Sequence, residues 1–365
     1  MSGSESATLW ESRRIMQVCN TCRYCSGYCA VFPAMEKCRS FSEGDLEYLA
    51  NLCHDCRGCF HSCQYAPPQE FHLNLPRVMA QLRAESYAKY AWPASLAMFF
   101  RHNGRRVAIL STVSVAAILL LIEWLLGNGP LLGVHRGSGT FYQVVSYAAM
   151  VWIPLAMLLF SLTALGIGLA RFSSGMGWEP MRSVRPGHLM AAVRDVIILR
   201  YLGGDGDGCN DLNESFSFRR RWLHQTVFFG ALSCLVSTTV AAVYDHLLHR
   251  MAPYAFWSLP VVTGTLGGIA LVIGTAGLFW IKVRRDQRPT AEEHLGMDIV
   301  FAAQLFLVGL SGLLLLLLRE TAAMGGLLAV HLGLVAGLFL ALPYGKFIHS
   351  VYRFAALVRY AAEDR

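Results

Sequence analysis

Eight cysteines near the amino terminus carry the clearest chemical signal in this sequence. They form two runs with the spacing C-x2-C-x2-C-x3-C, which are Cys19, Cys22, Cys25 and Cys29, then Cys53, Cys56, Cys59 and Cys63. Thiolates at this spacing wrap a cubane [4Fe–4S] cluster, and the fourth cysteine of each run usually ligates the other cluster. We therefore predict two [4Fe–4S] clusters. The ligand sets are Cys19, Cys22, Cys25 and Cys63 for one, and Cys53, Cys56, Cys59 and Cys29 for the other.

Zinc and disulfide bonds are the alternative uses of these cysteines. Zinc sites use C-x2-C pairs separated by a spacer, without a third cysteine two residues on. Disulfides need an oxidising compartment, and residues 1–18 lack the basic start and apolar stretch of a signal peptide. Ala30 and Gln64 follow the fourth cysteines where bacterial ferredoxins have proline, which shifts the turn but removes no ligand. Cys38 and Cys209 are expected to be packed structural thiols.

Helical patterns surround these cysteines. Between the two runs, Gly44 to Leu52 holds helix formers with apolar residues at 46, 49 and 52, which favours an all-helical two-cluster ferredoxin over the βαββαβ kind. A second helix is predicted from Pro76 to Tyr90, with proline in its first turn. We predict a cytoplasmic ferredoxin-like domain over residues 1–92. The apolar piece that follows, up to Arg101, is expected to lie along a membrane surface.

The rest of the chain is apolar enough to cross a membrane repeatedly. Hydrophobic residues make up 55% of the 365 residues, and the mean hydropathy is +0.42, above what a soluble core requires. Residues 93–365 are predicted to form a transmembrane domain, because six apolar stretches each have the length needed for a span. They are Val107–Leu126, Val144–Leu169, Trp222–Leu247, Leu259–Ile281, Met297–Leu318 and Met324–Ile348. Glycines in the fourth stretch predict close helix packing.

Basic residues predict the orientation of these spans. The formal net charge of +7 would fit a nucleic-acid partner, but the Lys and Arg residues lie in segments that flank the spans. Segments on the amino-terminal side include eight arginines between Arg171 and Arg221, whereas the opposite loops hold only Arg136, Arg250 and Arg319. This asymmetry predicts both termini in the cytoplasm, with the long loop 171–221 on the same side. In that loop, His188–Leu202 reads as an amphipathic helix and Gly203–Asn210 as a tight turn.

Histidines inside the predicted spans are candidates for haem ligands, because ionisable residues are costly in a bilayer. Twenty-two residues separate His224 from His246, and eighteen separate His331 from His349, so each pair is close to whole helical turns apart. Spans three and six run in opposite directions. We therefore predict two bis-histidine haem b sites, His224 with His349 and His246 with His331. His249 is the rival of His246, and histidines at the interface bonding headgroups or backbone remain the alternative.

Acidic residues at span ends or within spans are candidates for proton relay to a quinone, with solvation at the interface as the alternative. They are Glu123, Asp245, Asp298 and Glu320.

Several segments together resemble the tricarballylate-utilisation B, or citrate-utilisation B, family of membrane iron–sulfur proteins. Besides the cysteine runs and six spans, they are GDGCN (206–210), RRRWLH (219–224), APY (252–254), GTLGGIALVIGTAGL (264–278), HLGLVAGLFLALPYGKF (331–347) and YRFAALVRYA (352–361). The resemblance implies a protein of the bacterial inner membrane that reoxidises a FAD-dependent tricarballylate dehydrogenase and passes electrons to the quinone pool. The membrane part is also similar to the haem b gamma subunit of nitrate reductases.

The expected fold is all-α, an N-terminal helical two-cluster ferredoxin domain fused to a six-span bundle. The expected function is electron transfer through two [4Fe–4S] clusters and haem b to quinone, with the flavin on a partner because no nucleotide motif occurs in the chain. A heterodisulfide-reductase-like oxidoreductase subunit is one alternative, although the chain lacks the adjacent cysteine pairs it would need. A transporter with a redox-sensing domain is another, although no convincing inverted repeat is visible.

Overall fold

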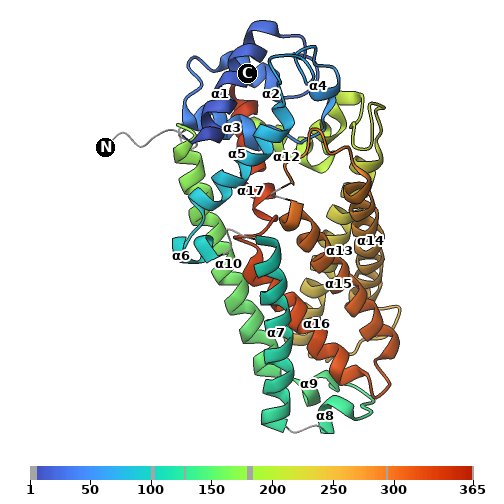
Figure 1. Cartoon of the computed structure of the whole chain (residues 1–365). Coiled ribbons are helices and arrows are strands. Elements are labelled where there is room, and N and C mark those ends of the chain that lie inside the picture. Colours follow the sequence, from blue (N-terminus) through green and yellow to red (C-terminus); the bar gives the residue numbers. More distant parts are fainter. Residues whose placement is uncertain (1–5, 100–102, 127–128, 179–183, 293–294, 364–365) are drawn as a thin grey trace.

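The computed structural model of the chain describes residues 6–99, 103–126, 129–178, 184–292 and 295–363. These residues form an all-helical protein, in which the sole β pairing of the described segments is the isolated bridge between Cys209 and Ser217. A small domain of short helices caps one end of a long bundle, and the carboxyl terminus lies within that domain (Figure 1). We call this end of the bundle proximal and the opposite end distal. The expected all-α fold with its helical N-terminal domain is confirmed.

The N-terminal domain is built from short helices that are joined by the cysteine-bearing loops. Ser42 begins the helix α3 with a capping box, since its side chain accepts from the backbone N–H of Asp45 while the Asp45 carboxylate accepts from the N–H of Ser42. The side chain of Asn74 caps α5 in a similar way. The helices of the domain are α1 (Ala7–Cys22), α2 (Val31–Lys37), α3 (Glu43–Leu52), α4 (Gly58–His61), α5 (Leu75–Tyr90) and α6 (Ala94–Phe99).

Six long apolar helices follow, each of sufficient length and composition to cross a membrane. They are α7 (Asn103–Leu126), α10 (Tyr147–Gly175), α13 (Arg219–His246), α14 (Leu259–Arg284), α15 (Leu295–Leu318) and α16 (Met324–Ala341). Short helices α8 (Gly129–Leu132) and α9 (Phe141–Val144) lie at the distal end (Figure 1). The six predicted spans thus correspond to six helices, as in a multi-pass membrane protein.

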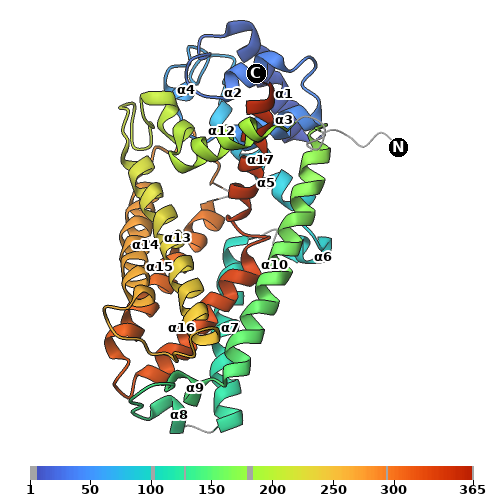
Figure 2. The same ribbon diagram turned by 180° about the vertical axis from the view of Figure 1, so that it is seen from behind.

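The glycines of α14 form close contacts with its neighbours. A Cβ atom on Gly267 would lie 2.8 Å from the carbonyl oxygen of Gly230 in α13, and one on Gly268 would lie 3.0 Å from the Leu313 side chain in α15. Real Cβ atoms do not approach other atoms this closely, so only glycine permits these helix–helix distances. Helices α13 and α14 accordingly run side by side along one flank of the bundle, opposite α10 (Figures 1 and 2).

The sixth predicted span ends earlier than expected. The helix α16 ends at Ala341, and a new helix, α17 (Ile348–Glu363), begins after a stretch of turns. Pro343 and Gly345 lie in this break, where proline removes a backbone donor and clashes with the preceding turn. The prediction of one continuous span to Ile348 is wrong. The argument that His331 and His349 share a helical face is therefore wrong as well, because no single helix joins them.

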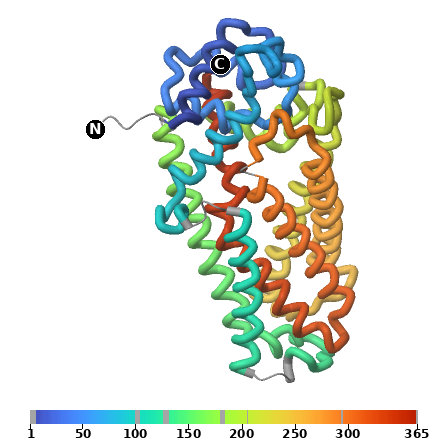
Figure 3. Tube along the Cα trace, viewed as in Figure 1, coloured from blue at the N-terminus to red at the C-terminus, as the bar shows by residue number. Residues whose placement is uncertain are grey.

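The helix α17 enters the core of the N-terminal domain. Its residues Tyr352 and Ala356 are fully buried in one hydrophobic cluster with Leu49 of α3 and Met79 of α5. The same cluster takes in Phe172 from the proximal end of α10, whose ring stacks on Tyr352 with centroids 4.5 Å apart. Figure 3 shows this last segment of the chain rising into the domain at the end of the bundle. The core around the cysteine loops is thus completed by residues far along the chain.

The predicted amphipathic helix of the long loop is α12 (Pro186–Ile197), followed by the 3-10 helix η2 (Arg200–Gly206). The Cys209 thiol is fully buried beneath η2 and donates to the carbonyl of Leu202 over 2.6 Å. Leu199 and Leu202 pack with Cys209 and with Cys56 of the N-terminal domain. The loop therefore covers the second cysteine run, and Cys209 is a packed thiol there.

Candidate functional site: a cysteine cavity and a histidine cavity

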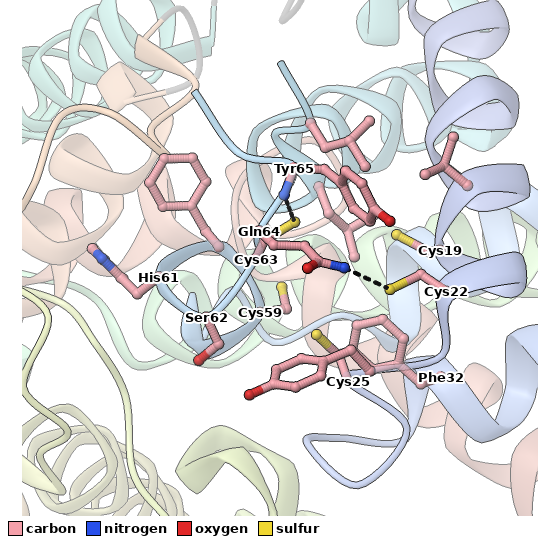
Figure 4. Close-up of a pocket in the computed structure, with 15 residues that line it drawn as sticks. Cys19, Cys22, Cys25, Phe32, Cys59, His61, Ser62, Cys63, Gln64 and Tyr65 are labelled. Atoms are coloured by element: carbon pink, nitrogen blue, oxygen red, sulfur yellow. Dashed lines mark hydrogen bonds between the residues drawn. The ribbon is translucent and has the colours of Figure 1, made fainter. Parts of the chain in front are cut away.

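The first cysteine set surrounds a cavity in the N-terminal domain. Cys19 and Cys22 are in the last turn of α1, Cys25 is in the following loop, and Cys63 comes from the second run after α4. The side chains of all four line one cavity of about 290 Å³, which we call the cysteine cavity. Figure 4 shows their sulfur atoms around this space, together with that of Cys59. Cys63 and Cys59 of the second run thus lie beside the first run, and the predicted ligand sets stay predictions.

The second set of cysteines is described by the thiols that lie close enough to shift one another's pKa. Burial, followed by the nearby thiols of Cys56 and Cys53, raises the pKa of Cys29 well above its usual value. The pKa of Cys59 is raised by burial and then by the thiols of Cys56, Cys29, Cys53 and Cys25, in that order. In contrast, the pKa of Cys19 is raised to about 12 by burial and then by Cys63, Cys25 and Cys22. Cys29 and Cys59 thus lie near Cys53 and Cys56, and Cys19 lies near Cys22, Cys25 and Cys63. The two groups adjoin, because Cys25 also affects Cys29 and Cys59, and Cys59 also lines the cysteine cavity.

Residues in left-handed backbone conformation bend the cysteine loops. Arg23, with φ of 53°, lies between Cys22 and Cys25. Asp55 and Arg57, with φ of 55° and 68°, stand on either side of Cys56. Such conformations cost roughly 1–2 kcal/mol for a residue with a side chain. Their concentration in these loops is what allows successive cysteines to point into one space.

The donor set suits a polynuclear cluster better than a single ion. Buried thiols stay protonated unless a cationic partner offsets the cost of the thiolate, and the raised pKa of Cys25, about 12 because of burial and its neighbours Cys63 and Cys22, expresses that cost. In the described part of the chain no three His, Cys, Asp or Glu side chains converge tightly enough for one ion. In a cubane each thiolate binds a different iron, so its four ligands lie farther apart.

Two contacts to the cysteine cavity had no signal in the sequence. The Gln64 side-chain amide donates to the Cys22 sulfur over 4.0 Å, and the backbone N–H of Tyr65 points at the Cys63 sulfur at 3.4 Å. Both residues stand where bacterial ferredoxins have the Cys-Pro step and the residue after it. Since N–H donors to sulfur stabilise the thiolate form, these contacts influence how readily bound iron accepts an electron.

Three arginines hold the loop that carries Cys53 from the bundle side. Arg83 and Arg353 both donate to the carbonyl oxygen of Cys53, the latter over 2.9 Å. Arg220 donates to the carbonyl oxygens of the next two residues, over 3.3 and 2.6 Å. Burial, and then the charge of Arg83, lowers the pKa of Arg353 to about 10. These arginines come from α5, α17 and α13, so their convergence on one loop could not be read from the sequence.

The same arginines line a second cavity, about 230 Å³ in volume, which contains His224 and His349. We call it the histidine cavity. The two imidazole rings stand 6.2 Å apart between centroids, with planes at 88°. The Nδ1 atom of His349 is hydrogen-bonded to the carbonyl of Lys346, which leaves its Nε2 free, while the buried Nδ1 of His224 has no partner in the described structure. Two imidazoles so spaced can bind one metal centre axially, since metal–imidazole bonds are about 2 Å each.

The distal histidines have separate partners. The Nδ1 atom of His246 lies 2.6 Å from the Tyr147 hydroxyl of α10 and is exposed at the end of α13. The Nδ1 atom of His331 lies 2.9 Å from the Ser311 hydroxyl, and its ring packs on Gly312 of α15. His249 is exposed beyond α13, with φ of 51°. The structure thus brings His224 to His349 but holds His246 and His331 apart from direct contact.

Of the acidic residues considered for proton relay, Asp298 lies in the histidine cavity. Its carboxylate is 2.5 Å from the Lys282 ammonium and 2.7 Å from that of Lys346. Glu123 and Glu320 are exposed on α7 and beyond α15. Asp298 of α15 therefore belongs to a partly buried ion triad, whose Lys346 lies in the break between α16 and α17, three residues before His349.

Comparison with known proteins gives one consistent result. A family model described as "Citrate utilization protein B" matches residues 101–365, and one described as "Citrate utilization protein B Fer4-like domain" matches residues 12–89. A relative from Escherichia coli, "Citrate utilization protein B", is 42% identical over 361 residues, covering 97% of this chain and 92% of the relative. No solved structure matches the chain significantly.

Proposed function

Because the chain belongs to the citrate utilization protein B family, we propose that it is a membrane protein that carries electrons from a FAD-dependent dehydrogenase to the quinone pool. The Fer4-like domain supports iron–sulfur electron transfer as the general role. The observation that carries the finer proposal is the position of Arg353. Its side chain binds the Cys53 carbonyl, and it lies one helical turn from His349. The second cysteine set and the histidine pair are therefore joined by one residue.

Each cofactor has a candidate set of ligands in this chain. Cys19, Cys22, Cys25 and Cys63 would hold one [4Fe–4S] cluster, and Cys53, Cys56, Cys59 and Cys29 the other. His224 and His349 would hold one haem b, and His246 with His331 would hold a second. The placement of the thiols and of the first histidine pair fits these groups. Such centres supply one-electron transfer when bound.

Residues of this chain define the environment of that transfer. The N–H donors at Gln64 and Tyr65 face sulfur, and the carbonyl of Lys346 fixes which nitrogen of His349 is free. Asp298, between Lys282 and Lys346, is held as the carboxylate, so the protons of this triad are on the two ammonium groups. Reduction of a quinone to a quinol takes up two electrons and two protons, so a triad that can pass on a proton near the electron route fits that need.

The flavin would be on a partner. The resemblance of the sequence to tricarballylate-utilisation proteins indicates tricarballylate dehydrogenase, docking on the domain that holds the cysteine cavity. The excess of arginine in loops on the proximal side supports a bacterial inner-membrane protein with both termini in the cytoplasm. In that orientation the cysteine cavity faces a soluble cytoplasmic partner.

The test is a metal and haem analysis of anaerobically purified full-length protein, with optical spectra before and after dithionite. We expect about eight iron atoms in clusters per chain, plus b-type haem bands. Zinc in place of iron would contradict the cluster assignment. Clusters without any haem band would favour a redox-sensing transporter, and turnover of an organic acid without a flavoprotein would contradict the partner assignment.

A further inference from the structure

The histidine cavity has an excess of positive charge that its own carboxylates do not balance. Seven Lys or Arg side chains line it, against three Asp side chains. The Asp298 carboxylate forms ion pairs with the ammonium groups of Lys282 and Lys346. Asp55 lies 3.6 Å from Arg57. Arg220 pairs with Asp211 over 3.2 Å, outside the cavity lining.

Arg353 and Arg83 are the unbalanced cations. Within the described segments neither forms an ion pair with an acidic side chain, and both use backbone carbonyls of the Cys53 region as acceptors. The Nε atom of Arg353 is buried and has no hydrogen-bond partner in the described structure. A guanidinium that is bound on one edge and free on another can still receive an anion, and the planar fork of arginine matches a carboxylate. Burial without such an anion is costly.

The position of Arg353 relative to the histidines is equally informative. It lies four residues after His349 on α17, and Arg220 lies four residues before His224 on α13. Because α13 and α17 both lead to the N-terminal domain at this end, each arginine stands about 6 Å from its histidine on the proximal side. A flat ligand held between the two imidazoles would direct polar groups at its proximal edge toward Arg353.

We propose that the Arg353 side of the histidine cavity, with Arg83 behind it, is a carboxylate-binding site. A carboxylate can come from two sources, the propionate groups of a haem bound by His224 and His349 or a free di- or tricarboxylate. The inference rests on the proposed function where the source is haem. It adds that Arg353 is a positioning residue, which fixes the ligand's acidic edge against the loop of Cys53.

The first experiment compares protohaem with its dimethyl ester, which lacks the propionate charges. Haem-free full-length protein is titrated with each, and binding is followed by the absorbance of the bound haem. In the wild type we expect the ester to bind about 10- to 100-fold more weakly, since a hydrogen bond to a charged group is worth about 1.5–3 kcal/mol. Arg353→Gln should largely abolish this ratio, whereas Arg353→Lys, which keeps the charge, should keep most of it. The matched control is Arg284→Gln, at an exposed arginine at the end of α14.

The second experiment tests the free carboxylate. Citrate and tricarballylate are added to haem-free wild type and to Arg353→Gln, and the midpoint of thermal unfolding is measured. Stabilisation of the wild type alone, with equal binding of haem and ester, assigns the site to a free carboxylate. If the wild type binds haem more tightly than the ester and Arg353→Gln does not, the site is assigned to the haem propionates.

Some outcomes would overturn the site. The site is ruled out if two results occur together. The ratio of the affinities for haem and its dimethyl ester is the same in the wild type, Arg353→Gln and Arg284→Gln, and neither citrate nor tricarballylate changes the unfolding midpoint. If Arg353→Gln does not fold, as judged by loss of its iron, Arg83→Gln is tested in the same way. Failure of the wild type to bind haem at all would instead contradict the proposed haem site, and only the carboxylate titration would then decide.

Discussion

At the proximal end of the bundle, two histidines from different helices face each other, whereas at the distal end each histidine has a partner of its own. His349 begins α17, which continues into the packed core of the N-terminal domain, and His224 is near the start of α13, where Arg220 binds the loop of Cys53. His246 is held by a tyrosine and His331 by a serine. Sites whose ligands are already in position lose less conformational freedom on binding. We therefore expect that the proposed proximal haem site is preformed and that the proposed distal one must rearrange to bind.

The difference has a structural origin. The proximal ends of α13 and α17 are tied to the loop of Cys53 by Arg220 and Arg353. The distal end of α13 has no comparable anchor to α16, since its described contacts there run to α10 and α14. The hydrogen bonds of His246 and His331 to Tyr147 and Ser311 are on Nδ1, so a ligand between the two rings would bind their Nε2 atoms, and the helices would have to bring the rings together. The proximal site is therefore the firmer of the two.

The largest effect is expected from removing a proximal histidine. His349→Ala should remove one haem completely, because an axial ligand is lost and the preformed pair is broken. His224→Ala should do the same, and the double substitution should remove no more than either alone. The measurement is haem content per chain in the membrane-extracted protein, with the iron of the clusters as an internal control for folding. His249→Ala is the matched control at an exposed position, and it should retain full haem content.

The same measurement of haem content tests whether the distal histidines differ from the proximal pair. If His246→Ala and His331→Ala each remove the other haem, the distal pairing is supported in spite of their separate partners. If His331→Ala keeps the haem content of the wild type, there is no distal haem on that residue and His331 is a packed polar side chain. Equal haem loss from His249→Ala and His246→Ala would move the ligand assignment to the segment beyond α13.

The next effect concerns how electrons reach the proximal site. Cys56→Ala removes a proposed ligand of the second cluster and should leave the haem content unchanged. Reduction of the haem by a reduced flavoprotein should become as slow as in a control without the flavoprotein. Dithionite, which is not selective for one entry point, should still reduce the haem. Cys209→Ser, at a buried thiol that packs against Cys56, is the control and should be mild. Unchanged haem reduction in Cys56→Ala would show that electrons bypass the second cluster.

The sequence predicts the helical fold well, because that fold follows from local patterns. Six apolar stretches become six helices. The ligand sets predicted from the cysteine spacing stay predictions. The helical-face argument for the histidines fails, because Pro343 and Gly345 end α16 before His349. His224 and His349 meet nevertheless, since α13 and α17 converge at the proximal end. That convergence depends on tertiary packing, which no local pattern encodes.

The arginines illustrate the same limit. Arg83, Arg220 and Arg353 are far apart in the sequence and look like ordinary flanking charges of the spans. In the folded chain they converge on the backbone of the Cys53 loop. The sequence shows the charge of each arginine, but the backbone carbonyl that accepts its hydrogen bond is set by the tertiary structure. The sequence therefore suggests the histidines of this cavity as candidate ligands but not the arginines that line it with them.

A smaller effect is expected from the partner of His331. Ser311→Ala removes the hydrogen bond on Nδ1, which orients the ring and fixes its tautomer. If His331 is a ligand, haem affinity at the distal site should fall about tenfold, at the lower end of what such supporting contacts contribute. The proximal haem should be unaffected. Titration of haem-free protein with haem, resolved into two binding phases, measures this, and a change in the tighter phase would mean that His331 belongs to the proximal site.

The smallest effect is expected at Gly312, on which the ring of His331 packs. A Cβ atom there would lie 3.1 Å from Cε1 of His331, so Gly312→Ala must push the ring by a few tenths of an ångström. Crowding of this size costs about 1 kcal/mol, so the weaker haem-binding phase should change by less than about tenfold. Gly326→Ala in α16, where an added Cβ meets nothing within 4 Å, is the control and should leave both phases unchanged. An equal change in both haem phases of Gly312→Ala would contradict the independence of the two sites. A response confined to the weaker phase would place His331 at a separate, adaptable site.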